Sequence, residues 1–424
     1  MGKLEEATAG PQSDSVWRSF GKSIASLRKS LKASKTGVSL SQPVSETYDL
    51  NLIAVNIASG IMTGGYESTR FKSTSPKQVE GNIEILFLTE NNTPSIEKGL
   101  ALGKGSTFSR WLVESPPNVC TPSYLADAAS HIASLAPNHM SLEILEKEDC
   151  EKLGMGLYLG VAEASVEPPK FIHLIYRPFN EAARKIAIIG KGLTFDSGGY
   201  NLKAGAGSMI DMMKFDMGGA GAALGAARAI VDLKPPEVEI HFIIASCENM
   251  IDGKGLRPGD ILVASNGKTV EVNNTDAEGR LTLADALLYA QEQCQVDYIV
   301  DIATLTGACM IALGGEIGGM YASSDEVAHQ MQEASAKTGE KIWRMPLEQA
   351  YLEQLKSPIA DLKNTGGRMG GSITAALFLK EFIDLNRVKW SHLDIAGPVW
   401  NEKEGGATGF GAQLLAEWAM NYSS

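Results

Sequence analysis

The chain has 424 residues, of which 44% are hydrophobic and 21% are charged. This length exceeds what one hydrophobic core usually supports, so we expect a large domain with a smaller companion. The composition excludes an intrinsically disordered protein. The net charge of -12 argues against a general nucleic-acid binder, which needs a basic surface.

The cysteines and the apolar runs bear on the compartment. Five cysteines are spread along the chain without a C-x-x-C pair, which predicts reduced thiols in an intracellular protein. The longest nearly uncharged apolar region, 302–315, is rich in Thr and Gly and falls short of a membrane span. The first residues carry no apolar signal core. We expect a cytoplasmic protein, with a plastid location for a longer form that carries a transit peptide.

The first hundred residues predict a small α/β unit. Residues 16–35 are basic like a transit segment, but their apolar spacing also fits an amphipathic helix, which is the simpler interpretation. An extended run over 47–55 and a strand over 82–88 follow. A helix over 105–114 ends at the Pro pair of "SPPNVCTP". We therefore predict a partial N-terminal α/β domain over 1–104 and a second domain over 105–424.

Helices and strands alternate through the second domain. We expect helices over 124–135, 150–162, 218–233 and 283–293, and strands over 142–146, 170–176, 185–190, 239–247, 268–272 and 297–303. The alternation predicts an α/β fold with a mixed, mostly parallel sheet covered by helices on both faces. In such folds ligands bind at the carboxyl ends of the strands.

Charged side chains gather in the loops that follow these strands. They are four carboxylates and three cations, namely Lys191, Asp196, Lys203, Asp216, Asp276, Glu278 and Arg280. Each of them alone is explained by an ordinary turn or a surface position. Burying all of them together is costly unless something organises the charges, and two divalent metal ions would do so. Oxygen-rich ligands suit Mn2+, Mg2+ or Zn2+.

Other enzyme classes find less support. Gly219, Gly221 and Gly225 loosely resemble a dinucleotide-binding fingerprint, but a well-formed buried strand should directly precede that motif. Close packing of a helix rich in small residues is the simpler explanation. The six histidines show no H-E-x-x-H spacing and there is no G-x-S-x-G, which argues against a single-zinc protease and a serine hydrolase.

Four sequence motifs point to a known family. "GKGLTFDSGG", "MKFDMGGA", "NNTDAEGRLTLADAL" and "ATLTGA", in this order, resemble the leucyl aminopeptidase (cytosol aminopeptidase) family, of which "NTDAEGRL" is the signature. The similarity runs from about Arg110 to the C-terminus, and "GLTFDSGGYNLK" is most similar to the plant branch. The resemblance implies a metal-dependent enzyme that releases leucine-like N-terminal residues from peptides and dipeptides in intracellular turnover.

The resemblance also implies a role for each residue. Metal ligands fall on Lys191, Asp196, Asp216, Asp276 and Glu278. Asp196 and Glu278 would bridge two ions, Mn2+ or Zn2+ with Mg2+ as a further candidate, and the ions would activate a water that attacks the first peptide carbonyl. Lys203 would stabilise the oxyanion, and Arg280 would hold a bicarbonate proton shuttle. A side-chain pocket falls on Met213, Thr304, Gly307, Ala396 and Val399, although core packing explains each of these better when taken alone.

The family's assembly gives the expected partners. Family members form hexamers, so we expect a homohexamer that acts on peptides and binds neither membranes nor nucleic acid. The chain begins downstream of the family's usual N-terminal start, and we expect the absent strands to expose a sheet edge and weaken the hexamer. The alternative function is an oligomeric scaffold or chaperone-like protein with an incidental peptidase site.

Overall fold

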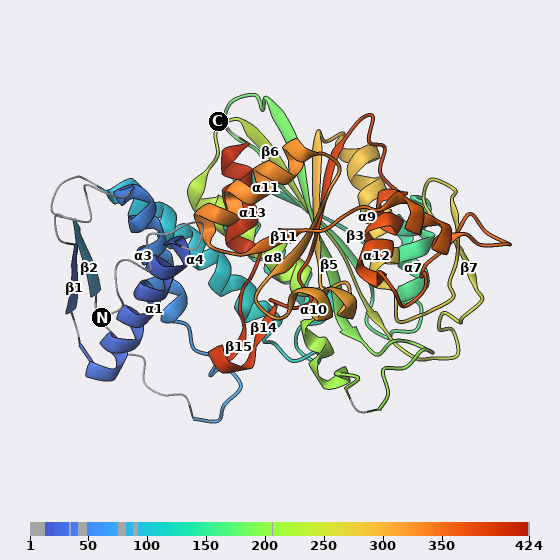
Figure 1. Ribbon diagram of the computed structural model, residues 1–424, viewed down its shortest axis with the longest axis horizontal. Coiled ribbons are helices and arrows are strands. Elements are labelled where there is room, and N and C mark those ends of the chain that lie inside the picture. The colour runs from blue at the N-terminus through green and yellow to red at the C-terminus, as the bar shows by residue number, and fades with distance from the viewer. Residues whose placement is uncertain are drawn as a thin grey trace.

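The structure is a computed structural model that describes residues 13–33, 35–40, 49–74, 82–87, 92–205 and 207–422. Its main body is an eight-stranded sheet covered by helices (Figure 1). The sheet contains β3 (Met140–Leu145), β4 (Lys170–Tyr176), β5 (Arg184–Asp196), β6 (Val238–Asn249), β9 (Tyr298–Ala303), β10 (Gly318–Ala322), β11 (Ile342–Arg344) and β13 (Lys389–Asp394).

Helices and shorter elements surround this sheet. The helices are α5 (Pro122–Leu135), α6 (Lys147–Lys152), α7 (Gly156–Ala162), α8 (Gly218–Leu233), α9 (Gly279–Tyr289), α10 (Gly307–Leu313), α11 (Asp325–Thr338), α12 (Gly371–Lys380) and α13 (Ala412–Asn421). The short strands are β7 (Ile261–Val263), β8 (Thr269–Glu271), β12 (Leu362–Lys363), β14 (Trp400–Asn401) and β15 (Gly406–Ala407). The 3-10 segments are η2 (Ile210–Phe215), η4 (Gln349–Leu355) and η5 (Glu402–Glu404), and η3 (Ala290–Cys294) is a π-helical turn.

The sheet order is β11-β10-β13-β9-β5-β6-β4-β3, and four of its seven pairings are parallel. The central run β13-β9-β5-β6 is wholly parallel, so the carboxyl ends of these strands meet at one edge. This arrangement confirms the predicted α/β class.

No helix within the described ranges has the length and apolarity needed to traverse a lipid bilayer.

Two hydrophobic cores lie on opposite faces of the sheet. Ile186 and Ile188 of β5 face the core that includes α5, α8, α11 and α13, whereas Ala187 and Ile189 face the core under α7, α9 and α12. This alternation is that of a strand buried on both sides. It explains why the central strands read as nearly continuous apolar runs.

The N-terminal part packs beside the main body (Figure 1). It consists of α1 (Ser13–Leu31), α3 (Leu50–Gly64), α4 (Thr93–Val113) and the parallel strands β1 (Lys35–Leu40) and β2 (Asn82–Phe87). Glycines allow the helices to touch: a Cβ on Gly21 would lie 2.3 Å from the carbonyl oxygen of Ile57, and one on Gly105 would lie 2.4 Å from that of Gly225. Close contacts therefore connect α1 to α3 and α4 to α8.

Several predicted elements need correction. Where described, the predicted extended run over 47–55 is the start of α3, capped by the Asp49 side chain, which accepts hydrogen bonds from two backbone amides. The predicted helix over 150–162 is divided into α6 and α7, with Gly154 at a φ of 69° between them. The strand expected over 185–190 continues to Asp196. Helix α4 begins well before residue 105 and crosses the domain boundary placed there, which stays a prediction.

Candidate active site

Lys191 lies in the middle of a buried cage at the end of β5. Its side chain is 4% exposed, and its Nζ lies 2.8 Å from Asp216 Oδ1 and Oδ2 and 3.0 Å from Glu278 Oε1. It also donates a hydrogen bond to the carbonyl oxygen of Thr304 at 3.1 Å. Burial alone would lower the pKa of Lys191, but the surrounding carboxylates outweigh it and raise this pKa above the ordinary value.

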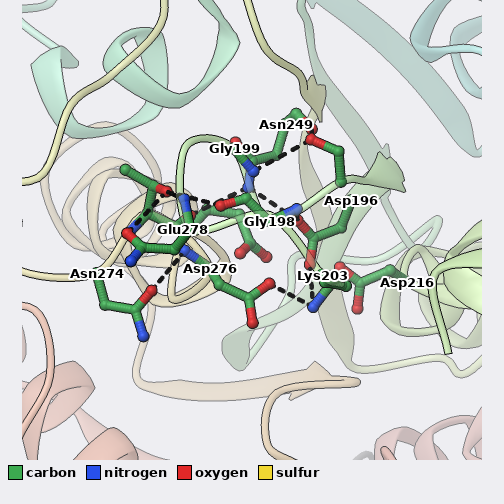
Figure 2. Close-up of polar contacts among 12 residues, drawn as sticks. Asp196, Gly198, Gly199, Lys203, Asp216, Asn249, Asn274, Asp276 and Glu278 are labelled. Carbon is green, nitrogen blue, oxygen red and sulfur yellow. Dashed lines mark hydrogen bonds and ion pairs between the residues drawn. The ribbon is translucent and has the colours of Figure 1, made fainter. Parts of the chain in front are cut away.

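Asp196 ends β5 just after an irregularity in the β5-β6 register between Leu193 and Phe195. Such a bulge changes the direction of the side chains that follow it. Asp196 Oδ1 accepts hydrogen bonds from the Gly198 amide and from Asn249 Nδ2, both at 2.8 Å (Figure 2). Gly198 has a φ of 86°, which other residues rarely adopt. The turn at Gly198 thus directs a backbone amide at the Asp196 carboxylate.

Asp216 and Glu278 reach the same point from two helix N-termini. Asp216 lies between η2 and α8, and the hydroxyl of Thr304 donates to its Oδ1 at 2.8 Å. Glu278 immediately precedes α9. One ligand atom from each of Asp196, Asp216 and Glu278 lies within 4.8 Å of the others (Figure 2). All three residues are buried.

These carboxylates carry more negative charge than the lysines balance. Burial and neighbouring carboxylates raise the pKa of Glu278 to about 8, and burial raises that of Asp216 to about 6. Glu278 Oε2 is buried without a hydrogen-bond partner. Three clustered buried carboxylates, one of which has an oxygen without a donor, suit a divalent cation, so the residues present fit a metal centre.

Lys203 and Asp276 form the rim of the cluster. Lys203 Nζ lies 2.8 Å from Asp196 Oδ2 and 2.5 Å from Asp276 Oδ1, and the Asp276 side chain is 33% exposed (Figure 2). Burial acts to lower the pKa of Lys203, but the carboxylates around it raise this pKa above the ordinary value. Lys203 therefore stays charged at the mouth of the site.

Arg280 stands apart from this ion-pair network. It is buried, its Nη1 donates to the carbonyl oxygen of Asn364 at 2.8 Å, and its Nε has no hydrogen-bond partner. Burial lowers the pKa of Arg280 to about 10, with Glu278 and Asp394 opposing the shift. The guanidinium is charged at neutral pH and retains a free donor.

The five residues predicted for a side-chain pocket lie around the start of α8 and the loops after β9 and β13. A Cβ on Gly218 would lie 2.5 Å from Val399 and 3.1 Å from the Thr304 methyl, so these two side chains adjoin at this helix end. Met213, Thr304, Ala396 and Val399 are buried, whereas Gly307 is exposed at the start of α10. Their role in binding substrate stays a prediction.

Sequence reasoning missed several neutral residues that hold the charged ones. Asn249 pairs with Asp196 in the β5-β6 register and bonds its carboxylate. Thr275 donates to the Gly198 carbonyl at 2.6 Å, and Asn364 accepts from Arg280 through its backbone. The position of Asn249, two residues beyond the strand predicted over 239–247, was the one signal that could have indicated it.

A buried group of carboxylates at the carboxyl edge of a mixed sheet is the arrangement expected of a metal-dependent α/β enzyme. Residues 107–416 match the cytosol aminopeptidase family, catalytic domain. The chain is 53% identical over 416 residues to leucine aminopeptidase 2, chloroplastic, of Arabidopsis thaliana, covering 97% of this chain and 71% of that protein.

Two further comparisons agree. A probable cytosol aminopeptidase of Picosynechococcus is 54% identical over 413 residues, covering 96% of this chain and 82% of that protein. The solved structure of a mutant of tomato leucine aminopeptidase superposes with a TM-score of 0.88 at 46% identity, covering 96% of this chain and 78% of that one. The chain belongs to the cytosol aminopeptidase family and is a metal-dependent aminopeptidase.

Proposed function

We propose that this enzyme releases leucine-like residues from the N-termini of peptides and dipeptides in intracellular turnover. The observation that carries the proposal is the convergence of Asp196, Asp216 and Glu278 within 4.8 Å, with Lys191 and Lys203 paired against them. The three buried carboxylates outnumber the two lysines that pair with them, which favours a cation-binding site over a balanced ion-pair network.

We assign metal ligation to five residues: Lys191, Asp196, Asp216, Asp276 and Glu278. The oxygen-rich set suits Mn2+ or Zn2+, with Mg2+ as a further candidate. Two such ions would, when bound, anchor the substrate amino group and acidify a water for attack on the first peptide carbonyl. The restriction to free N-termini follows from that anchoring.

Lys203 and Arg280 are proposed as the catalytic pair. Lys203 is held charged by two carboxylates at the rim of the cluster, where a cation stabilises the developing oxyanion. Arg280 remains protonated and so does not serve as a base. Its planar guanidinium, with an unpaired Nε–H, suits a bicarbonate ion that carries protons to and from the reacting groups.

Side-chain selection is proposed for the buried surface around Met213, Thr304, Ala396 and Val399, with Gly307 at its open side. A pocket of apolar groups that contains a flexible methionine accepts leucine-like side chains and discriminates weakly among them. We expect methionyl and leucyl substrates to be cleaved at similar rates and aspartyl substrates poorly.

We further propose a homohexamer in the cytoplasm, with a plastid location for a longer form. Relatives named cytosol aminopeptidase and chloroplastic leucine aminopeptidase support the two locations respectively. Sedimentation velocity of the full chain tests the assembly, and a monomer as the sole species would contradict it. None of the contacts described above favours a scaffold function over catalysis.

Hydrolysis of leucyl-amide with added Mn2+ tests the activity. We expect turnover by the parent chain and at least a hundredfold loss in Glu278→Gln and Lys203→Ala. Lys254→Ala provides the matched control, because this exposed lysine lies outside the site. A folded, Mn2+-saturated parent without turnover would overturn the proposed activity, and full activity in the Glu278 and Lys203 variants would show that the site is misplaced.

A further inference from the structure

A second cluster of metal-binding side chains lies away from the candidate active site. His173 on β4 and His241 on β6 are diagonal neighbours on one face of the sheet, because Ile175 pairs with His241 in the antiparallel register. Cys294 ends the π-helical turn η3 against this face. The exposed fractions of these three residues are 5%, 4% and 5%, and one ligand atom of each lies within 4.8 Å of the others.

The cluster sits at the far end of the central strands from the carboxylates. In the β5-β6 register His241 is opposite Ala187, near the start of β5, whereas Asp196 is at its end. The two groups share no residue, so the cluster is not an extension of the active site.

The distances approach those of a zinc site. His173 Nε2 lies 3.6 Å from Cys294 Sγ and 2.8 Å from His241 Nδ1. Tetrahedral zinc with Zn–N of about 2.0–2.1 Å and Zn–S of about 2.3 Å places nitrogen and sulfur roughly 3.6 Å apart and two nitrogens roughly 3.3 Å apart. Cys294 Sγ is already at that separation from His173 Nε2 and lies within 4.8 Å of the ligand atom of His241, whereas the two imidazoles need to part by roughly half an ångström.

The outer nitrogens of both imidazoles are held as they are in metal sites. Tyr289 Oη lies 3.0 Å from His173 Nδ1, and Glu239 Oε1 lies 3.0 Å from His241 Nε2. A histidine that binds a metal usually bonds a carboxylate or another oxygen through its other ring nitrogen, which fixes the ring orientation. Both rings meet this condition here.

Access and protonation also suit an ion. The three residues line a surface pocket of about 690 Å³ that also includes Glu143 and Glu239, the latter paired with Arg177 Nε at 3.2 Å and Lys185 Nζ at 3.6 Å. Burial lowers the pKa of His173 to about 3 and that of His241 to about 4, so both rings are neutral, as ligation requires. Burial raises the pKa of Cys294 to about 12, so the thiol must lose its proton when an ion binds.

We propose that His173 Nε2, His241 Nδ1 and Cys294 Sγ bind one Zn2+ ion that fastens β4, β6 and η3 together. With Glu239 accepting the Nε2 proton of His241, the Nδ1 lone pair of His241 is free for the ion. The proton of His173 moves from Nε2 to Nδ1, towards Tyr289, and the thiol proton of Cys294 leaves to solvent. Binding therefore releases one proton per ion, and the affinity rises with pH.

Cobalt absorption tests the proposal on the full chain. The candidate active site offers oxygen and amine ligands, so a thiolate-to-cobalt charge-transfer band in the near ultraviolet reports on a cysteine ligand and not on that site. We expect a Co2+ titration to produce this band up to one thiolate-bound ion per chain, in addition to the ions that the candidate active site takes up, Zn2+ to displace it, and Cys294→Ser to lack it. Cys247→Ala and Cys309→Ala, which change buried thiols elsewhere, serve as matched controls that keep it.

Second variants keep the result interpretable. Cys294→Ser and His241→Gln should melt as cooperatively as the parent in the absence of metal. Tyr289→Phe should retain the band, but its affinity for Co2+ should be lower by roughly tenfold or more. Two results would overturn the proposed zinc site: no band in the folded parent chain at millimolar Co2+, or a band that persists in Cys294→Ser. His173, His241 and Cys294 would then form only a hydrogen-bonded cluster of neutral side chains. Leucyl-amide hydrolysis should persist in Cys294→Ser, so the outcome is independent of the proposed activity.

Discussion

Gly279→Ala tests whether Lys191 is held as tightly as its contacts indicate. A Cβ at this position would lie 2.4 Å from Lys191 Cε and 2.7 Å from its Nζ. The ammonium cannot retreat without leaving Asp216 Oδ1 at 2.8 Å or Glu278 Oε1 at 3.0 Å. The substitution must therefore displace either the lysine or the start of α9, which carries Glu278.

The expected cost has two parts. Overpacking of a buried site costs about 1–3 kcal/mol, and losing one hydrogen bond between charged groups adds about 1.5–3 kcal/mol. A displacement of about 1 Å in a catalytic site lowers activity by roughly a hundredfold. Urea unfolding of metal-free protein and leucyl-amide hydrolysis at saturating Mn2+ measure the two effects.

Gly253→Ala is the matched control, because no atom lies within 4 Å of the Cβ that it adds. We expect it to match the parent chain in both assays. If Gly279→Ala also matches the parent, then Lys191 has room to move, and the cage around Lys191 is not rigid.

Substitutions at three further positions probe buried carboxylates, two at residues that hold them and one at such a carboxylate itself. Asn249→Ala removes a hydrogen bond to Asp196, so the Mn2+ concentration for half-maximal activity should rise about tenfold or more. Thr304→Val removes the hydroxyl that donates to Asp216 and should act similarly in the same titration, whereas Thr304→Ser should restore the parent value. Burial raises the pKa of Glu340 from an ordinary 4.5 to about 7, so its protonated form favours the folded state. The free energy of unfolding should fall by up to about 3 kcal/mol as pH rises through that interval, and Glu340→Gln should abolish this part of the pH dependence in urea unfolding. A parent curve unchanged by Glu340→Gln would contradict that shift.

The sheet was predictable because its central strands are apolar runs that are covered on both faces. The charged residues were predictable for a related reason, since parallel strands bring the loops after them to one edge. Lys191 and Asp196 lie on β5 and Asp216 lies just before α8, and the structure does bring them together. The roles given to these residues stay predictions.

Other features could not be read from the sequence. The apolar run in the first part of the chain lacks a clear period because α3 is buried on most sides, so an extended run and a helix were equally compatible with it. Asn249 and Asp196 are 53 residues apart, and Asn364 and Arg280 are 84 apart. Neither Asn249 nor Asn364 carries a local signal for its partner, because tertiary structure alone sets that partner; only the position of Asn249 near the end of a predicted strand pointed to the site.

The glycines around the site show how one pattern can serve two chemistries. A Cβ on Gly219 would lie 2.1 Å from the carbonyl oxygen of Ile302 and 2.7 Å from the Lys191 amide nitrogen. The start of α8 therefore approaches β5 and β9 as closely as a helix approaches a strand in a dinucleotide fold. Here η2 precedes the helix in place of a strand, and the space beside the glycines is taken by the Lys191 backbone. In a dinucleotide fold, the absence of a Cβ leaves room for a pyrophosphate. Here it lets the start of α8 approach β5 closely, and Asp216 pairs with Lys191.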